Sequence, residues 1–328
     1  MILRTLLLLF LMSGIAFAGN AQRTYTLVSY NCENLFDIRH DSLKNDHEFL
    51  PDGERRWSFS RYWRKVNDIG RVILQTGGQG NEWTLPDIVG LVEVENDSVM
   101  HTLTRRSLLR NACYNYVITN SEDDRGVDVA MMYNSNRMRL LTHENMKSPV
   151  VEGIRRTRDI LYASLATAYH DTLHVFIVHL PSRASGQYHT EGYRIRLVNQ
   201  ILAKVDTLQA AGARNILVLG DFNDYSYNRS IKRITESGFH EVTTGVRGLF
   251  HPDMVCGTYY FRQEWGSLDH IFVTSTITPK KCFIFDADWI LEEGSGGVLK
   301  PRRTFLGNYY HGGVSDHLPL VLRFAIQK

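Results

Sequence analysis

Short runs of mostly apolar, β-forming residues recur along the whole chain of 328 residues, with helical patterns between them. Several runs are apolar almost throughout, which is typical of strands in a sheet that is covered on both faces. The pattern therefore predicts a protein built on buried strands. The expected strands are Tyr25–Asn31, Asp87–Val94, Asp128–Tyr133, Leu161–Tyr169, His174–Leu180, Asn215–Leu219, His270–Thr274 and Leu320–Phe324.

Two segments between these runs carry the apolar spacing of amphipathic helices. In each, apolar residues recur every three or four positions, which places them on one helix face. We interpret both stripes as core contacts rather than cofactor contacts, and Gly212 can end the second helix. The stripes are Val66, Ile69, Val72 and Ile73, and then Val198, Ile201, Val205 and Leu208.

Two polar or glycine-rich stretches, 38–60 and 286–313, are predicted to be surface excursions. Loops of this length in a compact domain are often functional, and otherwise they are plain solvated loops. No internal repeat and no proline-rich linker divides the chain. We therefore expect a single domain over residues 23–326.

The charge balance gives no strong global field. The chain has 37 Lys and Arg and 35 Asp and Glu residues, a formal net charge of +2, with 43% hydrophobic and 22% charged residues. This is an ordinary globular composition. A protein that binds nucleic acid or an anionic membrane would need a local basic patch instead.

The first 18 residues have the three parts of a secretory signal. A short basic start, Met1–Arg4, precedes the apolar run Thr5–Phe17, and Ala16-Phe17-Ala18 forms a cleavage site. The run is short for a membrane span, which needs ~20 residues, so a retained anchor is the less favoured alternative. We expect a signal peptide over residues 1–18, export to the periplasm or the cell exterior, and no stable membrane insertion after cleavage. The mature protein is expected to be a monomer.

Export places the cysteines in an oxidising compartment. Cys32, Cys113, Cys256 and Cys282 allow three pairings, and the sequence does not choose among them. They have no CxxC spacing, which disfavours a zinc or redox motif. Cys32 lies at the end of an expected core strand, where it can also be a buried thiol.

Polar and acidic residues lie at the ends of the expected core strands. A charge beside a core strand is costly unless it is paired, bound to a metal or placed at an opening. Each residue alone is an ordinary strand-end residue, but the whole set at strand ends indicates a site. The set comprises Asn31, Glu33, Glu93, His179, Asp221, Asn223, Asp269, Asp316 and His317.

The residue types in this set narrow the chemistry. Carboxylate and amide oxygens are hard ligands suited to Mg²⁺, Mn²⁺ or Ca²⁺. The sequence has no GxSxG elbow, no GxxxxGK(S/T) phosphate loop and no HExxH helix, which disfavours a serine hydrolase, a nucleotide-driven motor and a zincin. Carboxylates together with histidines fit metal-assisted attack of water on phosphorus.

Six segments resemble, in order, the motifs of the endonuclease/exonuclease/phosphatase superfamily. They are Asn31–Glu33 (N-x-(D/E)), Asp87–Glu93 (D-I-x-x-L-x-E), His179–Arg183 (H-x-P-S-R), Gly220–Asn223 (G-D-x-N), Leu268–Asp269 (L-D) and Ser315–Pro319 (S-D-H-x-P). The resemblance covers nearly all of the mature chain. It implies a four-layered α/β sandwich, in which two mixed β-sheets pack face to face with flanking helices, and it places the site at one mouth.

The resemblance also implies the metal ligands. Glu93 is similar to the principal ligand, and Asn31 and Glu33 would support the metal or its waters, with Asp316 joining them. Glu33 departs from the Asp of some nucleases, so its longer side chain leaves direct ligation open. The expected cofactor is Mg²⁺, with Mn²⁺ or Ca²⁺ as alternatives.

Four further residues take catalytic roles in the family pattern. Asp221 resembles the residue that orients and deprotonates the attacking water, and Asn223 would hold that water or a phosphoryl oxygen. His317 would donate a hydrogen bond to a phosphoryl oxygen. Asp269 would keep His317 oriented and protonated, because a nearby carboxylate favours the imidazolium.

His179 resembles a histidine that assists the leaving group in the deoxyribonuclease branch. We expect Asp128 to orient it, since a carboxylate that enters a core strand needs a partner. The alternative is that Asp128 only closes the turn at residues 125–126 through a backbone hydrogen bond. Both interpretations stay open from the sequence.

The expected phosphate contacts are Arg183, just after His179, and Arg158, in a basic cluster ahead of a strand. The other arginines of that cluster, at 155 and 156, are interpreted as a solvated strand entry. Aromatic residues before the L-D motif either stack a base or sugar or pack in the core. These aromatics are Tyr259, Tyr260, Phe261 and Trp265.

Three functions remain. The first is a secreted nuclease or phosphodiesterase, with nucleic acid among its candidate substrates. The second is a lipid or small-molecule phosphoesterase, similar to a sphingomyelinase or an inositol phosphatase, with the same site. The third, an inactive binding module, is disfavoured by the complete set of motif residues. The near-neutral charge disfavours a tight duplex binder and allows short or single-stranded substrates.

Overall fold

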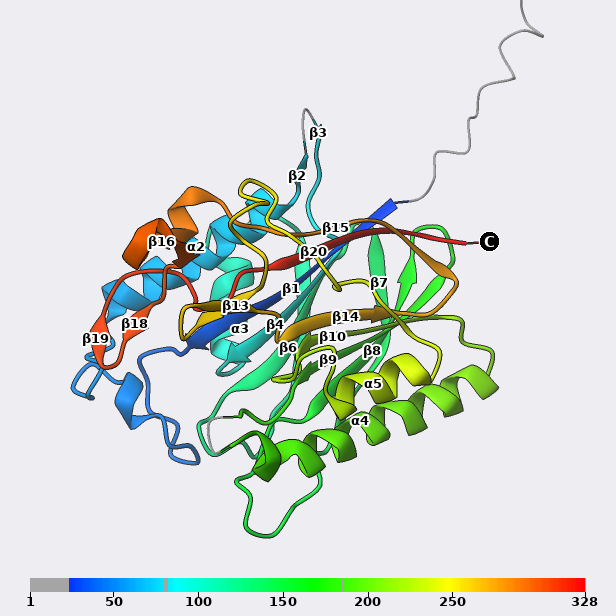
Figure 1. The fold of residues 1–328 in the computed structure, drawn as a ribbon, viewed down its shortest axis with the longest axis horizontal. Helices are drawn as coiled ribbons and strands as arrows, with labels where there is room; N and C mark the ends of the chain where they lie inside the picture. Colours follow the sequence, from blue (N-terminus) through cyan, green and yellow to red (C-terminus); the bar gives the residue numbers. More distant parts are fainter. Residues whose placement is uncertain (1–23, 80–81, 184–185, 328) are drawn as a thin grey trace, which may run out of the picture.

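The computed structural model describes residues 24–79, 82–183 and 186–327, so the expected signal peptide over residues 1–18 and the first residue of the expected domain, Arg23, lie outside it. Two six-stranded sheets pack face to face, and helices cover their outer faces (Figure 1). Each sheet contains both parallel and antiparallel neighbours. The structure confirms the four-layered α/β sandwich.

The first sheet has the strand order β15-β20-β1-β4-β6-β5. Its central neighbours β1 and β4 are parallel, whereas its other neighbours are antiparallel. The central pair therefore directs two carboxyl ends to the same edge of the sheet. The strands are β1 (Thr24–Leu35), β4 (Ile88–Val94), β5 (Tyr114–Ile118), β6 (Asp128–Asn134), β15 (Ile277–Ile284) and β20 (Leu320–Ile326).

The second sheet repeats this plan with the order β11-β14-β10-β9-β8-β7. Here β9 and β10 form the parallel pair, and the other neighbours are antiparallel. The strands are β7 (Met138–Met146), β8 (Ile160–Thr167), β9 (Thr172–His179), β10 (Asn215–Asp221), β11 (His240–Glu241) and β14 (Asp269–Val273).

In the described part of the chain, helices cover the outer face of each sheet (Figure 1). The helices α2 (Phe59–Thr76) and α3 (Asp97–Arg105) lie over the first sheet, and α4 (Gln187–Ala210) and α5 (Arg229–Glu236) lie over the second. Asn96 caps α3, since its side chain accepts a 3.0 Å hydrogen bond from the backbone nitrogen of Val99. Both predicted apolar stripes face the core, and α4 ends at Ala210, just before Gly212.

The two sheets approach each other closely at Gly90 of β4. A Cβ atom at this position would lie 2.7 Å from Leu219 Cδ1 and 3.1 Å from Ile177 Cδ1, both on the second sheet. These contacts are closer than van der Waals packing allows, so a side chain here would push the sheets apart. Glycine at residue 90 thus helps to hold the central strands of the two sheets together.

The structure confirms all eight predicted strands and adds elements that the sequence did not indicate. The stretch 286–313, expected as a surface excursion, contains two small hairpins and two 3-10 turns. The additional short elements are the hairpins β2–β3 (Gly78–Gln79, Glu82–Trp83), β12–β13 (Tyr259–Phe261, Glu264–Gly266), β16–β17 (Leu291–Glu293, Leu299–Pro301) and β18–β19 (Phe305–Leu306, Tyr309–Tyr310), with 3-10 turns His47–Phe49, Asp288–Ile290 and Ser295–Gly297.

In the described part of the chain, no helix is long and apolar enough to cross a membrane. The four cysteines, all of which are described, form no disulfide in this structure. Cys32 is a buried thiol on β1, in agreement with that interpretation of its position.

Candidate active site

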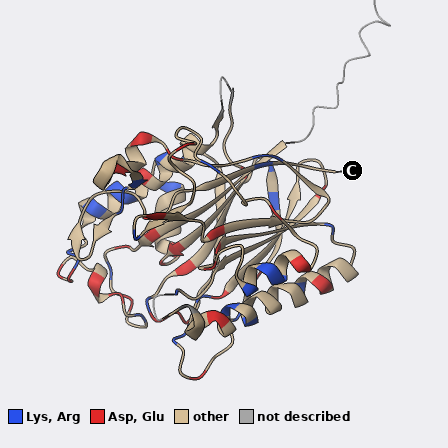
Figure 2. Cartoon of the chain, viewed as in Figure 1, with Lys and Arg blue, Asp and Glu red and all other residues tan. Residues whose placement is uncertain are grey.

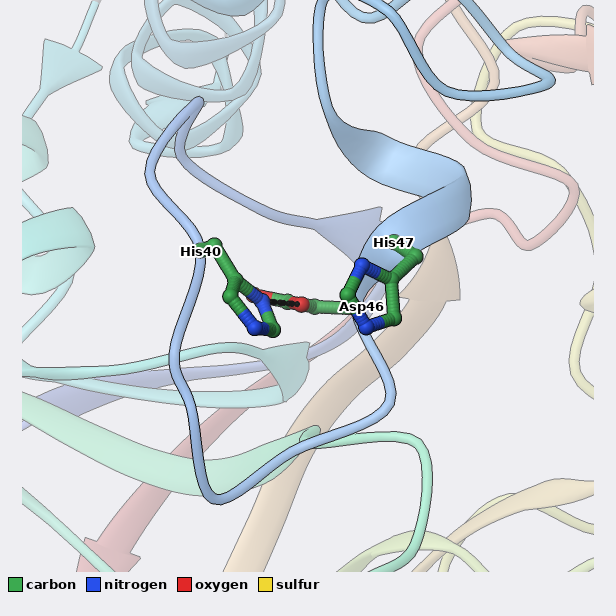
Figure 3. Close-up of side chains that lie close together, drawn as sticks. All are labelled: His40, Asp46 and His47. Atoms are coloured by element: carbon green, nitrogen blue, oxygen red, sulfur yellow. Dashed lines mark hydrogen bonds and ion pairs between the residues drawn. The ribbon is translucent and has the colours of Figure 1, made fainter.

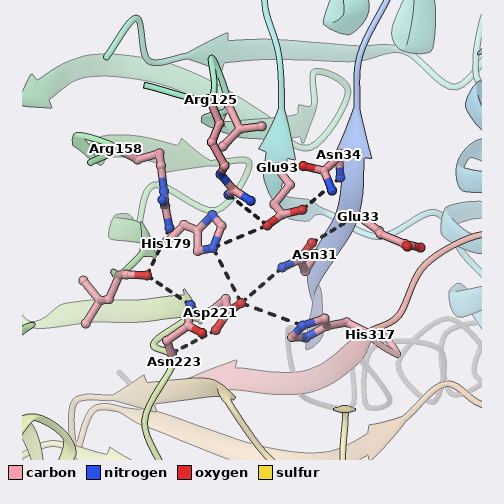
Figure 4. A network of polar contacts seen from close by, with 12 residues as sticks. Asn31, Glu33, Asn34, Glu93, Arg125, Arg158, His179, Asp221, Asn223 and His317 are labelled. Atoms are coloured by element: carbon pink, nitrogen blue, oxygen red, sulfur yellow. Dashed lines mark hydrogen bonds and ion pairs between the residues drawn. The ribbon is translucent and has the colours of Figure 1, made fainter. Parts of the chain in front are cut away.

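A cavity of about 530 Å³ opens where the two central parallel pairs end. Asn31 on β1 and Glu93 on β4 reach it from the first sheet, and His179 on β9 and Asp221 on β10 reach it from the second. Because parallel strands of both sheets end at this edge, residues far apart in the sequence converge there (Figure 4). The other lining residues are Arg125, Ser182, Arg183, Asn223, Tyr225, Tyr259, Phe261, Arg262, Leu268, Asp316 and His317.

Irregular backbone at the ends of two strands directs the side chains of Glu93 and Asn223 into the cavity. The register of β4 shifts between Val92 and Val94, and Glu93 between them has a φ angle of 61°. Asn223, just after β10, has a φ angle of 51°. Bulges and left-handed residues of this kind change the direction of side chains near functional sites. A left-handed backbone conformation costs about 1–3 kcal/mol for a residue other than glycine, and somewhat less for asparagine. This strain at both strand ends supports a functional role for the cavity.

Asp221 lies at the centre of the polar network in Figure 4. Its Oδ2 atom accepts a 3.1 Å hydrogen bond from Asn31 Nδ2 and lies 3.7 Å from His179 Nε2 and 3.9 Å from His317 Nε2. Its Oδ1 atom accepts a 2.9 Å hydrogen bond from the backbone nitrogen of Asn223. Burial, then the negative charge of Asp269, raises the pKa of Asp221 to about 7. A carboxylate poised near neutral pH suits a general base.

The glycine that precedes Asp221 allows β10 to pack closely against β9 at this position. Gly220 has a φ angle of 133°, and a Cβ atom there would lie 2.0 Å from the carbonyl oxygen of Val178 on β9. Only glycine fits this conformation and this spacing. Asn223 then donates a 3.0 Å hydrogen bond from Nδ2 to the carbonyl oxygen of Leu180, which fixes its side chain.

His317 is held as a cation against Asp269. The two side chains meet through His317 Nδ1 and Asp269 Oδ2, 2.7 Å apart, and both are buried. Burial by itself lowers the pKa of His317, but the charge and hydrogen bond of Asp269, with the charge of Asp221, raise it to about 10. The structure thus brings this pair together, as predicted, with Nε2 of the imidazole facing the cavity.

Glu93 is surrounded by positive charge. Its Oε1 atom lies 3.2 Å from Arg125 Nη2 and 3.7 Å from His179 Nε2, and its Oε2 atom accepts a 2.9 Å hydrogen bond from the backbone nitrogen of Asn34. Burial raises the pKa of this carboxyl, but the charges of Arg125, Arg158 and His317 outweigh it and lower the pKa overall. Glu93 is therefore a carboxylate at neutral pH, available to a cation.

His179 lies in the cavity as predicted, but Asp128 does not orient it. Asp128 Oδ1 accepts a 3.0 Å hydrogen bond from the backbone nitrogen of Ser121 and is bonded by the hydroxyls of Thr119 and Ser121. His179 Nδ1 has no hydrogen-bond partner among the described residues. The proposed pairing is wrong, because Oδ1 of Asp128 is bonded by residues 119–121 and Nδ1 of His179 makes no hydrogen bond to it.

The alternative role of Asp128, closing the turn at 125–126, is also wrong. That turn is closed by Asp123, whose Oδ1 atom accepts hydrogen bonds of 3.0 Å and 3.5 Å from the backbone nitrogens of Arg125 and Val127. Asp128 instead ties the start of β6 to residues 119–121.

A model of the endonuclease/exonuclease/phosphatase family matches residues 26–326, which is nearly the whole chain. The chain belongs to this family. Its members are phosphoesterase hydrolases, generally dependent on a divalent metal. Among curated proteins, no sequence gives a significant match.

Three solved structures illustrate the shared fold. An endonuclease/exonuclease/phosphatase family protein from Bacteroides thetaiotaomicron has 14% identity and a TM-score of 0.64, over 93% of this chain and 99% of that one. A mannosyl-6-phosphatase from the same organism has 14% identity and a TM-score of 0.63, over 92% and 100%. TDP2 from D. rerio, solved with a single-strand DNA product, has 17% identity and a TM-score of 0.57, over 92% and 98%. At such identities the likeness shows the fold.

The cavity offers the oxygen-rich donors that a divalent metal of this family would use. Glu93, Asn31 and Asp316 line it together, and the carboxylate of Asp316 also accepts a 2.8 Å hydrogen bond from Arg303 Nη2. Asp221, Asp269 and His317 form a second close group, with ligand atoms within 4.8 Å of one another. Several carboxylates around one cavity fit a hard divalent cation, which would offset their mutual repulsion.

Glu33 does not belong to this donor set. Its side chain does not line the cavity, and Figure 4 shows it directed away from Glu93 and Asp221. Its Oε2 atom accepts a 2.6 Å hydrogen bond from the backbone nitrogen of Thr304, and Oε1 lies 3.4 Å from that of Phe305. The structure thus does not bring Glu33 together with the other predicted metal ligands, because its carboxylate anchors the stretch 286–313.

The two predicted phosphate contacts, Arg183 and Arg158, lie in different environments. Arg183 lines the cavity, and its guanidinium carbon lies 4.8 Å from the ring centroid of Tyr225. Arg158 is buried behind the cavity, where Nη1 lies 3.0 Å from Asp123 Oδ2 and Nη2 lies 3.0 Å from the carbonyl oxygen of Leu180. Arg158 does not line the cavity, so the structure does not bring it together with Arg183 at the expected phosphate site.

Sequence reasoning missed the cationic side chains that do line the cavity beside Arg183. Arg125 comes from the turn before β6, and Arg262 comes from the tip of hairpin β12–β13. That hairpin also places two of the predicted aromatics, Tyr259 and Phe261, at the cavity. The only sequence signal was a pair of isolated arginines in polar turns, which is too common to single out a site.

Proposed function

We propose that this protein is an exported, Mg²⁺-dependent phosphodiesterase that hydrolyses a nucleic-acid-like diester by attack of water on phosphorus. The observation that carries the proposal is the environment of Asp221 Oδ2, which is faced by Asn31 and by two histidines of different charge. A base, a fixed cation and a neutral imidazole around one point form the arrangement that metal-assisted phosphoester hydrolysis needs.

In the proposed reaction, Asp221 accepts a proton from the water molecule whose oxygen bonds to phosphorus. The phosphorus–oxygen bond to the leaving group breaks as the new bond forms. Asn223, held by the carbonyl oxygen of Leu180, orients the water or a phosphoryl oxygen. The His317 imidazolium donates a hydrogen bond to a phosphoryl oxygen, and Asp269 fixes its ring.

Glu93, Asn31 and Asp316 are the residues that would hold the metal. A bound divalent cation would supply Lewis-acid activation and neutralise charge on the phosphoryl group. Arg125, 3.2 Å from Glu93 Oε1, keeps that carboxylate ionised and oriented. Mg²⁺ fits this set best, because it is usually bound by one or two carboxylates together with water and substrate oxygens.

The surroundings of the cavity favour a diester that carries bases. Tyr225, Tyr259 and Phe261 expose rings at the cavity, and base–aromatic stacking is worth about 1–3 kcal/mol per base. A second hollow of about 810 Å³ shares Arg125 with the cavity and is lined by Lys44, Lys147, Arg155 and Arg156 as well as by Glu122, Asp123 and Asp124. Figure 2 shows Lys and Arg spread over the described chain, so this hollow adds only a modest local excess of positive charge beside the cavity.

A small phosphate ester is the second candidate. The main cavity, of about 530 Å³, has the size of a small-ligand pocket, and hairpin β12–β13 contributes three of its lining residues. A small substrate would use Arg183 and Arg262 for its phosphate and would leave the second hollow unused.

The deciding experiment is a hydrolysis screen of the mature protein with Mg²⁺. The substrates are single-stranded DNA, RNA, sphingomyelin, inositol phosphates, a sugar 6-phosphate and bis-p-nitrophenyl phosphate, and the matched control is Asp221→Asn. We expect the highest kcat/KM on a nucleic-acid diester, with full loss in excess chelator. A preference for a monoester would replace the diester proposal with the second candidate, and full activity in chelator would refute both.

Export is tested separately. The basic start, apolar run and cleavage site predict a mature chain that begins near Gly19. Sequencing the amino terminus of protein recovered from the periplasm or the medium checks this, and an intact Met1 there would contradict it.

A further inference from the structure

Outside the catalytic cavity, one other group of side chains brings three metal-binding atoms together in the described part of the chain. It consists of His40, Asp46 and His47, in the stretch that follows β1 (Figure 3). Their ligand atoms lie within 4.8 Å of one another. The phosphoester chemistry proposed above uses none of these residues.

The geometry of this group is already organised. His40 Nδ1 lies 2.5 Å from Asp46 Oδ1, and the rings of His40 and His47 have centroids 4.3 Å apart. Asp46 Oδ2 accepts a 2.7 Å hydrogen bond from the backbone nitrogen of Asp41. Asp46 is only 1% exposed, whereas both histidines are exposed. A fixed, buried carboxylate thus lies beside two imidazoles that solvent can reach.

The surroundings favour a cation. Glu95 is buried nearby, and its Oε2 atom accepts a 2.6 Å hydrogen bond from the backbone nitrogen of Asp37. Burial, then the negative charges of Asp37, Asp46 and Asp41, raises the pKa of Glu95 to about 8. Glu95, Asp37, Asp41 and Asp46 therefore lie close enough to repel one another, and a cation bound at Asp46 would relieve part of that repulsion.

We propose that His40, Asp46 and His47 form a second metal site, selective for Zn²⁺ and distinct from the catalytic cavity. Two imidazoles and one carboxylate are the ligand types that zinc prefers, and three protein ligands leave the fourth tetrahedral position to water. Ligand atoms around tetrahedral zinc lie about 3.4 Å apart. The present ligand atoms lie within 4.8 Å of one another, so binding would require only side-chain rotation of the exposed imidazoles.

The position of the site indicates what the zinc does. Asn45 donates a 3.3 Å backbone hydrogen bond to Asp124, and Lys44 Nζ donates to the carbonyl oxygen of Ser121. The segment between the two histidines therefore packs on the turn that carries Arg125, the residue paired with Glu93. Zinc bound at the base of this segment braces it against the catalytic cavity.

The test measures zinc binding by the mature protein after chelator treatment. Equilibrium dialysis gives the affinity, and metal analysis gives the number of zinc ions per chain. Mg²⁺ is held in excess so that it occupies the oxygen-rich catalytic site. We expect one Zn²⁺ per chain, at least tenfold weaker binding in His40→Ala and in His47→Ala, and loss of binding in the double variant. Co²⁺ in place of Zn²⁺ should give the visible absorption of a tetrahedral site, which the double variant should lack.

Two controls separate this site from others. His143→Ala removes an exposed histidine on β7 and should leave zinc binding unchanged. Asp221→Asn disrupts the catalytic group of ligands and should also retain the zinc. Full zinc stoichiometry in the double variant, or no zinc on the parent protein, overturns the proposal. Mg²⁺-dependent hydrolysis is measured separately on the parent protein, so that failure of the zinc site and failure of the proposed hydrolysis are distinguished.

Discussion

The Nδ1 atom of His317 lies 2.7 Å from Oδ2 of Asp269, and both side chains are buried beside the catalytic cavity. Thr258 donates a 2.6 Å hydrogen bond from its hydroxyl to the same carboxylate oxygen, which fixes the acceptor. The ring of Tyr259 packs on His317 with centroids 4.8 Å apart. The imidazole is therefore held in one orientation, with Nε2 directed to Asp221 at 3.9 Å.

This pair predicts a bell-shaped dependence of kcat/KM on pH. The pKa of Asp221 is raised to about 7, so activity should rise as pH passes that value and the base becomes charged. The pKa of His317 is raised to about 10, so activity should fall as the imidazolium loses its proton there. Asp269→Asn removes a charge that raises both pKa values, and both limbs should then move to lower pH. An unmoved alkaline limb in this variant would contradict the role of Asp269.

Asp221→Asn is expected to lower kcat by about 10²–10⁴-fold, because loss of a general base typically raises the barrier by roughly 3–5 kcal/mol. Asparagine keeps the shape of the side chain, so the circular dichroism spectrum should match that of the parent protein. Steady-state kinetics on the preferred substrate measure the effect. A kcat within threefold of the parent value would remove Asp221 from the role of base.

Glu93→Gln is expected to weaken Mg²⁺ binding by at least tenfold, since the amide keeps one oxygen but loses the charge that the cation needs. Isothermal titration with Mg²⁺ measures this. Glu33→Gln is the matched control, because it makes the same substitution in the same pair of motif strands but at a side chain that faces away from the cavity. Equal losses in both variants would return Glu33 to the metal site.

Glu33→Ala is instead expected to lower stability. The change leaves the buried backbone nitrogen of Thr304 without its 2.6 Å acceptor, and it removes a negative charge near the buried Lys65. Unsatisfied buried groups of this kind cost about 1–3 kcal/mol each, so the free energy of unfolding in urea should fall by a similar amount. Glu236→Ala, at an exposed position on α5, is the control and should change stability by less than about 0.5 kcal/mol. An unchanged stability for Glu33→Ala would contradict the anchoring role.

The sequence predicted those parts of the fold and site that depend on local patterns. The eight core strands were visible because burial on both faces makes several of them apolar almost throughout, as in Ile88–Val92. Glu93, His179 and Asp221 could be placed together because each ends a strand that runs towards the same edge of its sheet. Short hairpins such as Tyr259–Phe261 with Glu264–Gly266 escaped notice, because three-residue strands have too few positions to show a period.

The errors concern side chains whose partners are distant in the sequence. Glu33 meets Thr304, 271 residues away, and nothing in the N-x-(D/E) pattern indicates that contact. Asp128 and Arg158 both bond to residues of the polar turn at 119–123 instead of to His179 or the cavity. A pattern identifies which residues are costly to bury, but the choice among possible partners is made by tertiary packing.

The electrostatic state of His179 gives it a role different from that of His317. Burial, then the positive charges of Arg158 and Arg125, lowers the pKa of His179 well below its usual range. The ring is therefore neutral near pH 7 and carries one hydrogen. Its Nε2 atom lies 3.7 Å from acceptors on both Glu93 and Asp221, whereas Nδ1 has no partner, so the hydrogen is favoured on Nε2. A neutral donor at this point can stabilise charge that develops on the leaving oxygen.

The last prediction uses leaving groups of different basicity to test that role. An alkoxide leaving group needs a proton or a hydrogen bond as it departs, because it is a strong base. The p-nitrophenolate ion is a weak base and scarcely needs such assistance. His179→Ala should therefore lower kcat/KM for a natural diester on the order of 10²-fold and lower it much less for bis-p-nitrophenyl phosphate. Asp128→Asn is the matched control, because Asp128 bonds to Thr119 and Ser121 rather than to His179. In this variant, kcat/KM for the natural diester and for bis-p-nitrophenyl phosphate should change equally. Equal losses on both substrates in His179→Ala would place this histidine in phosphate binding or metal support instead.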